Sequence, residues 1–394
     1  MKILTRRTAL LAACAIVAVL LAKLTISSPA LFRPTHINDF VEYWASSRLL
    51  LTGKNPYSVA ELSSLQKSVG WINDKPLIMW NPPWTLTFLI PFGFLEFPIA
   101  EFLWLVCNCA ILLFCAKQLW TIYGGSIVQC RVAWIMTFLF APTIVVLLTG
   151  QIGPLILLGV VGFLHFEMRK QYGLAGASLV LVAIKPHLIY LLWPALLMWT
   201  IERKRWAAIF GLSLGMLAVS MVVLVLDPAV FNEYRLLNLT APPPTPFDQE
   251  TPTLGRALKN LVMPESGLSQ FLPSLVGILW LPFYWKTYKT NWEWTRQMPV
   301  ILLVSLTTTF FAWTCDQVVL LPALLQATVW CLDNRLREAI LLPMTFYLVV
   351  NFGAPLLKFF TPHDFWYFWI ALTWLLIYLM MYKQVIIKQA RVVV

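Results

Sequence analysis

The sequence predicts an all-α fold, a polytopic bundle of helices that cross a membrane. Hydrophobic residues make up 59% of the 394 residues and charged residues only 12%, with a mean hydropathy of +0.74. A soluble domain carries roughly 25% charged residues, so this chain has too few of them to form a surface that faces water on all sides. Apolar runs of about 15 to 25 residues recur along the chain, and this is the length that a membrane helix needs.

The net charge of +11 does not indicate a nucleic-acid partner, because the basic residues are spread over short clusters between the apolar runs. Cytoplasmic loops of membrane proteins carry an excess of Lys and Arg. The side that bears these clusters is therefore predicted to be cytoplasmic, together with both termini. The clusters lie at residues 2–7, 169–170, 203–205, 286–296, 335–337 and 383–391.

The seven cysteines and four histidines form neither a disulfide framework nor a metal motif. The cysteines fall in or beside apolar runs, where they behave as small hydrophobic residues. Cys107 and Cys109 lack the C-x-x-C spacing of a metal or redox site, and the histidines are scattered. We expect no tightly bound cofactor and predict no metal ligand.

The whole chain, residues 1–394, is predicted to form a single transmembrane domain. Its apolar stretch from Thr8 to Ile26 follows basic residues, as in a signal peptide, but it is longer than a typical signal-peptide core. We interpret it as an uncleaved first helix. Residues 30–80 then form an extracytoplasmic loop, in which Trp44, Tyr57 and Trp71 lie among polar residues. This pattern is typical of short helices at a membrane interface.

About 12 spans are predicted, with later runs at 83–97, 99–120, 131–149, 151–168, 174–200, 206–226, 270–285, 297–315, 317–332, 338–353 and 364–382. The run at 83–97 is either a full span or a half-helix that returns, and only the half-helix keeps the later basic clusters cytoplasmic. The run at 174–200 is predicted to break at Lys185 and Pro186, because proline disrupts a helix interior. Residues 227–269 form a second extracytoplasmic loop with a stiff, proline-rich run.

Polar residues gather at the predicted extracytoplasmic ends of the spans. Glu42 and Tyr43 lie three and four residues after Asp39, so a helix would place all three side chains on one face. Each candidate also has an ordinary explanation, such as a solvated helix capped by Asp39, a helix cap at Asp316, or a snorkelling Lys185. Together they describe a rim on one membrane face that suits a substrate with a lipid tail and an anionic headgroup. The candidate substrate-binding residues are Glu42, Tyr43, Asn81, Gln151, Lys185, His187, Arg256, Asp316 and Gln317.

The order of the motifs resembles glycosyltransferase family 87, the polyprenol-phosphate-mannose-dependent mannosyltransferase-like membrane proteins with a GT-C fold. The resemblance runs from about residue 35 to 330, and one departure lies near its end. Family members often carry His in the late Trp motif, where this chain has Cys315, Asp316 and Gln317, so a role of that His cannot be transferred. The matching segments are 38–44 (NDFVEYW) with 53–57 (GKNPY), 81–83 (NPP) with Pro91, 150–151 (GQ), 175–176 (AG) leading to 185–186 (KP), and Trp313 with 316–317 (DQ).

The resemblance implies an inverting hexosyltransferase that moves mannose or a related sugar from a polyprenyl-phosphate donor to a lipid-linked or glycan acceptor. It also implies a multi-pass protein of the cell membrane whose active site lies outside the cytoplasm. Asp39 corresponds to the family's general base, and a carboxylate within about 3 Å of a hydroxyl can accept its proton. Lys185 or Arg256 would stabilise the leaving phosphate. The identity of the sugar and acceptor, and whether a divalent metal assists Asp39 and Glu42, stay open.

A multi-pass transporter or flippase of lipids or solutes is the alternative. Such a protein would also have many spans, a broken helix and polar residues at membrane depth. Transporters, however, are commonly built from two related halves with a site near the midplane. Here the polar residues gather at one face, which favours the transferase.

Overall fold

The computed structural model describes residues 38–240, 245–332, 341–353 and 364–392, and all regular structure in these ranges is helical. The all-α prediction is confirmed for this part of the chain. The predicted first span at residues 8–26 lies outside it. The α-helices are α2 (Phe40–Leu51), α3 (Val59–Ser68), α4 (Leu86–Gly93), α5 (Phe97–Ile122), α6 (Cys130–Phe138), α7 (Ala141–Thr149), α8 (Gly153–Met168), α9 (Tyr172–Ser178), α10 (Leu192–Arg203), α11 (Trp206–Leu226), α12 (Val230–Thr240), α13 (Leu254–Leu261), α14 (Leu272–Tyr288), α15 (Trp294–Thr308), α16 (Leu321–Leu332), α17 (Leu341–Leu348) and α19 (Trp369–Val392).

Four helical stretches in the described ranges are long and apolar enough to cross a membrane: Phe97–Ile122, Trp206–Leu226, Thr314–Leu332 and Asp364–Val385. A fifth is a pair bent by 62°, Ile127–Phe138 with Ala141–Thr149. All five fall on predicted spans, but the prediction of about 12 spans is not confirmed. Within the described ranges, the remaining apolar runs form helices that are shorter or broken.

The predicted run at 83–97 forms a half-helix. A 3₁₀ turn, η1 (Pro83–Thr85), leads into α4, which has only 8 residues. Such a helix is about 12 Å long, whereas the hydrocarbon core of a bilayer is about 30 Å thick. The element therefore does not cross the membrane, and α4 instead packs against α2.

Prolines and one asparagine explain the broken spans. The 174–200 run divides into α9, a 3₁₀ turn η3 (Val182–Ile184) and α10, and Lys185 leaves the helical region with φ −132°. The break predicted at Lys185 and Pro186 is thus confirmed, since a residue before proline avoids the helical conformation. At the bend between α6 and α7, the backbone N–H of Ala141 donates to Asn351 Oδ1 at 2.6 Å. This bond satisfies a donor that the bend removes from the helix.

Helix α2 is buried against other helices, so the ordinary explanation of a solvated helix does not hold, whereas the predicted position at a membrane interface stays a prediction. Phe40, Tyr43 and Trp44 are buried, and Phe40 stacks on Trp104 of α5 with ring centroids 5.2 Å apart. Trp44 donates through Nε1 to the carbonyl of Leu95 at 2.9 Å. Burial of each large apolar side chain stabilises the packing by roughly 2 kcal/mol. The core therefore fixes the helix that follows Asp39.

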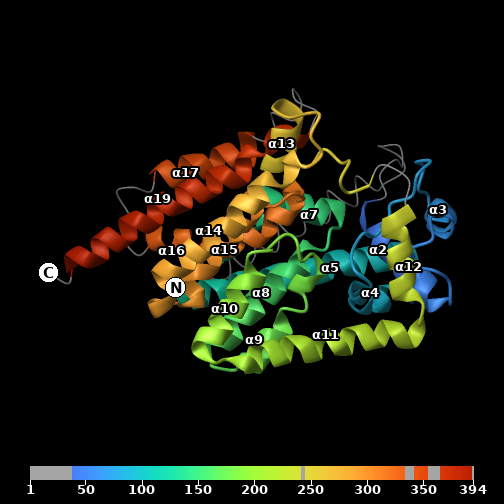
Figure 1. The fold of residues 1–394 in the computed structure, drawn as a ribbon, viewed down its shortest axis with the longest axis horizontal. Coiled ribbons are helices and arrows are strands. Elements are labelled where there is room, and N and C mark those ends of the chain that lie inside the picture. The colour runs from blue at the N-terminus through green and yellow to red at the C-terminus, as the bar shows by residue number, and fades with distance from the viewer. Residues whose placement is uncertain (1–37, 241–244, 333–340, 354–363, 393–394) are drawn as a thin grey trace.

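The two predicted extracytoplasmic loops contact each other. Helices α2, α3 and α12 lie together at one end of the elongated molecule, opposite the C-terminus (Figure 1). The Tyr234 hydroxyl of α12 donates to the carbonyl of Trp80 at 3.0 Å, and its ring lies 5.2 Å from that of Tyr57. The sequence did not predict α12 or α13 within the second loop. Their packing makes both loops walls of one structure.

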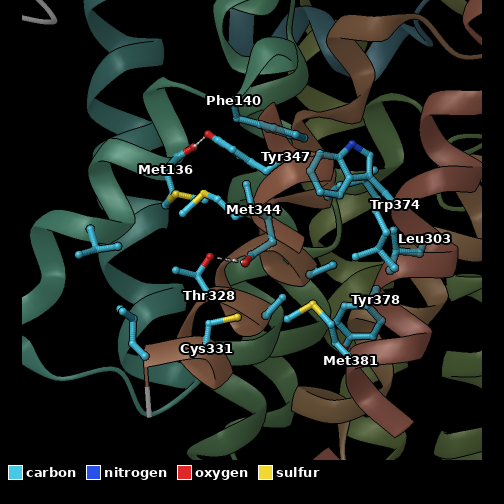
Figure 2. Close-up of a pocket in the computed structure, with 17 residues that line it drawn as sticks. Met136, Phe140, Leu303, Thr328, Cys331, Met344, Tyr347, Trp374, Tyr378 and Met381 are labelled. Atoms are coloured by element: carbon cyan, nitrogen blue, oxygen red, sulfur yellow. Dashed lines mark hydrogen bonds between the residues drawn. The ribbon is translucent and has the colours of Figure 1, made fainter. Parts of the chain in front are cut away.

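An apolar cavity of about 150 Å³ lies among α6, α15, α16, α17 and α19. Figure 2 shows its lining, with Trp374 and Tyr378 of α19 facing Met136 and Tyr347 across the space. The Tyr347 hydroxyl is used by a bond to the carbonyl of Met136. The lining residues carry no carboxylate, ammonium or imidazole group. The lining therefore offers no group that carries a charge near neutral pH.

Candidate active site

A larger, polar cavity of about 910 Å³ opens between α2, the 71–82 segment, the α7–α8 turn, the turn after η3 and residues 311–315. These segments lie far apart in the sequence, from Asp39 to Cys315, and the fold gathers them around one space. Seven of the predicted site residues line it: Asp39, Glu42, Tyr43, Asn81, Gln151, Lys185 and His187.

Asp39 stands at the N-terminus of α2, but its side chain makes no capping hydrogen bond to this helix. The neighbouring Asn38 accepts from the Phe40 backbone N–H at 3.1 Å in its place. Asp39 Oδ2 instead accepts from Gln151 Nε2 at 2.9 Å. The carboxylate is therefore directed to the cavity and is not used to cap the helix. This contradicts the ordinary explanation of Asp39 as a helix cap and favours a role in the cavity.

Glu42 and Tyr43 share this wall of the cavity with Asp39, as their spacing predicted. Burial raises the pKa of Glu42 to about 8, and the nearby charge of Asp39 adds to the rise. Burial also raises the pKa of Asp39, but the hydrogen bond from Gln151 and the charge of Lys185 oppose that rise. Near neutral pH, Glu42 thus keeps its proton while Asp39 has two groups that favour its charged form.

Lys185 forms a buried ion pair with Asp316. Its Nζ lies 2.8 Å from Asp316 Oδ1, and the residues are only 8% and 1% exposed. Asp316 Oδ2 also accepts from the backbone N–H of Trp313 at 2.8 Å, so Asp316 caps the 3₁₀ turn η6 (Thr314–Leu320). Removing one partner of a buried pair costs about 3–5 kcal/mol, because the other charge is left unpaired. Asp316 thus holds Lys185 at the cavity wall without lining the cavity itself.

Asn81 and His187 join different walls. Asn81 Nδ2 donates to the carbonyl of Ile184 at 3.2 Å, which ties the first loop to the broken helix. The His187 ring lies between Phe310 and Phe311, with centroids 5.7 Å from each. Its buried Nε2 has no hydrogen-bond partner within the described residues. Asn81 is thus used in positioning, whereas His187 retains a polar atom beside the cavity.

The structure does not bring Arg256 or Gln317 to the cavity lining. Arg256 is 5% exposed, and its Nη2 donates to the carbonyl of Phe247 at 2.6 Å. Gln317 is buried in η6 and its Oε1 has no partner among the described residues. Of the two cations predicted to face a phosphate, only Lys185 lies at the cavity.

Sequence reasoning missed an aromatic part of the lining. Trp80, Tyr234 and Phe311 border the cavity together with Trp71 and Trp313. The sequence indicated Trp71 only as an interfacial residue and Trp313 only as part of the late Trp motif. The signal available in the sequence was the position of Trp80 directly before the Asn81-Pro82-Pro83 motif. Aromatic faces present flat apolar surfaces with a polar handle. The cavity lining therefore combines charged groups with aromatic rings.

In the described part of the chain, no group of three or more His, Cys, Asp or Glu residues is arranged to hold a metal ion.

A model of glycosyltransferase family 87 matches residues 79–350. Asn81, Gln151, Lys185 and His187 lie within the match, whereas Asp39, Glu42 and Tyr43 precede it. No curated protein and no solved structure matches the chain. Because the family match covers more than half of the sequence, the chain belongs to glycosyltransferase family 87 and is a membrane glycosyltransferase.

Proposed function

We propose that this glycosyltransferase moves a hexose, mannose in the first instance, from a polyprenyl-phosphate donor to a lipid-linked or glycan acceptor outside the cytoplasm. The observation that carries the proposal is the polar cavity, whose lining includes Asp39 and Lys185. The Gln151 side chain contacts both of these residues and so connects the two walls. A base and a cation are the two groups that displacement of a phosphate by a hydroxyl needs.

The proposed step is an inverting displacement. Asp39 accepts the proton of an acceptor hydroxyl while the hydroxyl oxygen forms a bond to the anomeric carbon of the sugar. The bond between that carbon and the phosphate oxygen breaks, and the electron pair leaves with the polyprenyl phosphate. Glu42, which keeps its proton near neutral pH, donates a hydrogen bond that orients the acceptor. No group outside the chain and its two substrates is needed to balance the step.

Lys185 is proposed to contact the donor phosphate. An ammonium group has three N–H donors, and the contacts of Lys185 with Asp316 at 2.8 Å and Gln151 at 3.4 Å use two of them. The third is available to a phosphate oxygen in the cavity. Arg256, whose guanidinium donates to Phe247 away from the cavity, is not assigned this role.

The apolar helices and the distribution of basic clusters support a multi-pass protein of the cell membrane with this cavity on the extracytoplasmic side. A lipid-linked donor would then keep its tail in the bilayer and reach the cavity with its phosphate and sugar. The transporter alternative is not favoured by the family match.

The experiment compares lipid extracts from cells with and without the chain by mass spectrometry of their glycans. We expect a glycan or glycolipid that is heavier by one hexose only in cells with the active chain, and absent with Asp39→Asn. A substrate that changes sides of the membrane without gaining a sugar would contradict the proposal and support a transporter.

A further inference from the structure

The Gln151 side chain occupies the centre of the polar network and makes three contacts. The Tyr43 hydroxyl donates to Gln151 Oε1 at 2.8 Å, and Lys185 Nζ lies 3.4 Å from the same oxygen. Gln151 Nε2 donates to Asp39 Oδ2 at 2.9 Å. An ammonium group can only donate and a carboxylate can only accept. The amide oxygen must therefore face Lys185 and the amide nitrogen must face Asp39.

The backbone of Gln151 is also held in place. Gly150 has φ +72°, which ends α7 in a left-handed turn, and its carbonyl accepts from Trp104 Nε1 at 2.7 Å. A Cβ at Gly150 would come within 2.9 Å of Phe40 Cβ and 3.0 Å of Asn38 Oδ1. The turn therefore packs directly against the residues on both sides of Asp39. This close approach explains why Gly-Gln stands opposite the Asn-Asp-Phe segment.

We propose that Gln151 is a positioning residue that holds Asp39 in its ionised form and keeps Oδ1 of that carboxylate for the acceptor hydroxyl. The bond from Gln151 uses only Oδ2. Tyr43 and Lys185 fix the direction of the amide, and Asp316 holds Lys185. A chain of polar contacts thus runs from Asp316 to Asp39. This inference rests on the proposed role of Asp39 as base, and it replaces substrate binding as the role of Gln151.

The charged and titratable groups that face Asp39 come from three elements. Glu42 and Tyr43 belong to α2, Lys185 follows η3, and Cys315 belongs to η6. Loss of the Gln151 bond leaves burial, which favours the protonated carboxyl of Asp39, opposed by the charge of Lys185. The sign of the expected change follows: without Gln151, Asp39 holds its proton to a higher pH.

The test titrates full-length protein in lipid nanodiscs by infrared difference spectroscopy. The carboxyl C=O band that is absent from Asp39→Asn reports the protonation of Asp39. We expect its midpoint to rise by about one pH unit in Gln151→Ala. It should rise further in the near-isosteric Gln151→Glu, because a second carboxylate then faces Asp39. Gln66→Ala is the matched control, since Gln66 is buried and bonds only to the backbone of Leu77 through both amide atoms.

An unchanged midpoint in both Gln151 variants would overturn the inference, even if transfer were reduced. A rise of the same size in Gln66→Ala would also overturn it, because the effect would then be a general consequence of lost packing. Gln151→Glu keeps the volume of the side chain and so tests the inference should Gln151→Ala not fold. The titration needs no substrate, so its outcome is separate from that of the proposed function: transfer by Asp39→Asn would refute the base while leaving these midpoints to stand.

Discussion

Asp39 at the start of α2 and Glu42 one turn later are both partly buried, but different neighbours act on their pKa values. Burial raises the pKa of Glu42 to about 8, and the charge of Lys185 offsets only part of this rise. Asp39 accepts a hydrogen bond from Gln151 and faces the charge of Lys185. When their environments give two neighbouring carboxyl groups different pKa values, one commonly acts as the base and the other as the hydrogen-bond donor. This division underlies the assignment of Asp39 as the base.

Glu42→Gln should remove a pH-dependent loss of stability. Between its ordinary pKa near 4.5 and its folded value of about 8, Glu42 binds a proton in the folded state that it loses on unfolding. Stability therefore falls as pH rises through this window. The Tm of Glu42→Gln should match that of the parent near pH 5 and exceed it near pH 9. Exposed Glu265→Gln is the control, and an equal Tm difference at both pH values would contradict the burial of Glu42.

The role of Lys185 can be tested without leaving its partner unpaired. Lys185→Met alone leaves the buried Asp316 carboxylate without its cation, a cost of about 3–5 kcal/mol. The double variant Lys185→Met/Asp316→Asn removes both charges and should keep the fold. We expect it to lose at least tenfold in affinity for a polyprenyl-phosphate mannose probe, whereas Lys185→Arg retains part of the affinity and Asp316→Asn most of it. Unchanged affinity in the double variant would move the phosphate site elsewhere.

The sequence identified the residues of the site better than the contacts that these residues make with one another. Helical spacing was enough to place Asp39, Glu42 and Tyr43 on one face. The ion pair of Lys185 with Asp316 spans 131 residues, and no local pattern predicts such a contact. The sequence offered Arg256 on the second loop as another cation for the phosphate, but its guanidinium group donates to the carbonyl of Phe247 in the same loop. Long-range packing, which propensity and periodicity do not contain, decided between them.

At the scale of elements, the turn between α7 and α8 has the strictest backbone requirement near the site. Gly150→Ala should strain the left-handed turn and push against Phe40 and Asn38. Gly124→Ala is a matched control, because Gly124 also has a positive φ, +81°, but a Cβ there meets nothing within 4 Å. Each variant should lose roughly 1 kcal/mol of stability from backbone strain. Only Gly150→Ala should also lose most of its transfer activity, and equal activity in the two variants would contradict this account.

The elements predicted best were those whose signal is local. The break at Lys185 and Pro186 follows from the covalent geometry of proline, and the long helices α5 and α11 follow from long, predominantly apolar runs. The burial of α2 could not be predicted, because its charged and aromatic residues are also typical of an interface. Its apolar partners come from α4 and α5, whose place beside it depends on the tertiary fold.

At the scale of the molecule, two loops that are separate in the sequence form one end of the structure. Helix α12 contacts the segment that precedes α4, and both border the polar cavity. The apolar cavity of Figure 2 lies among the later helices, so the molecule separates a region of apolar packing from the region with charged groups. This arrangement suits a protein whose embedded helices support a site near one membrane face.

The charge distribution makes this arrangement testable. A cysteine introduced at exposed Ser64 should react with a membrane-impermeant maleimide added to intact cells, because the first loop is predicted to face outward. A cysteine at exposed Lys204 should react only after the membrane is permeabilised. The parent chain, with its own cysteines, gives the background. Labelling of Lys204→Cys alone in intact cells would place the cavity on the cytoplasmic side.

The central claim, that Asp39 is the general base of sugar transfer in the polar cavity, is tested most directly by the turnover of Asp39→Asn. The full-length variant is compared with Asp74→Asn, the same change at an exposed aspartate of the same segment. With equal expression and Tm, we predict that Asp39→Asn loses about a hundredfold or more in turnover, the scale of lost general-base catalysis, and that Asp74→Asn is unaffected. Turnover by Asp39→Asn within a few fold of the parent would contradict the claim.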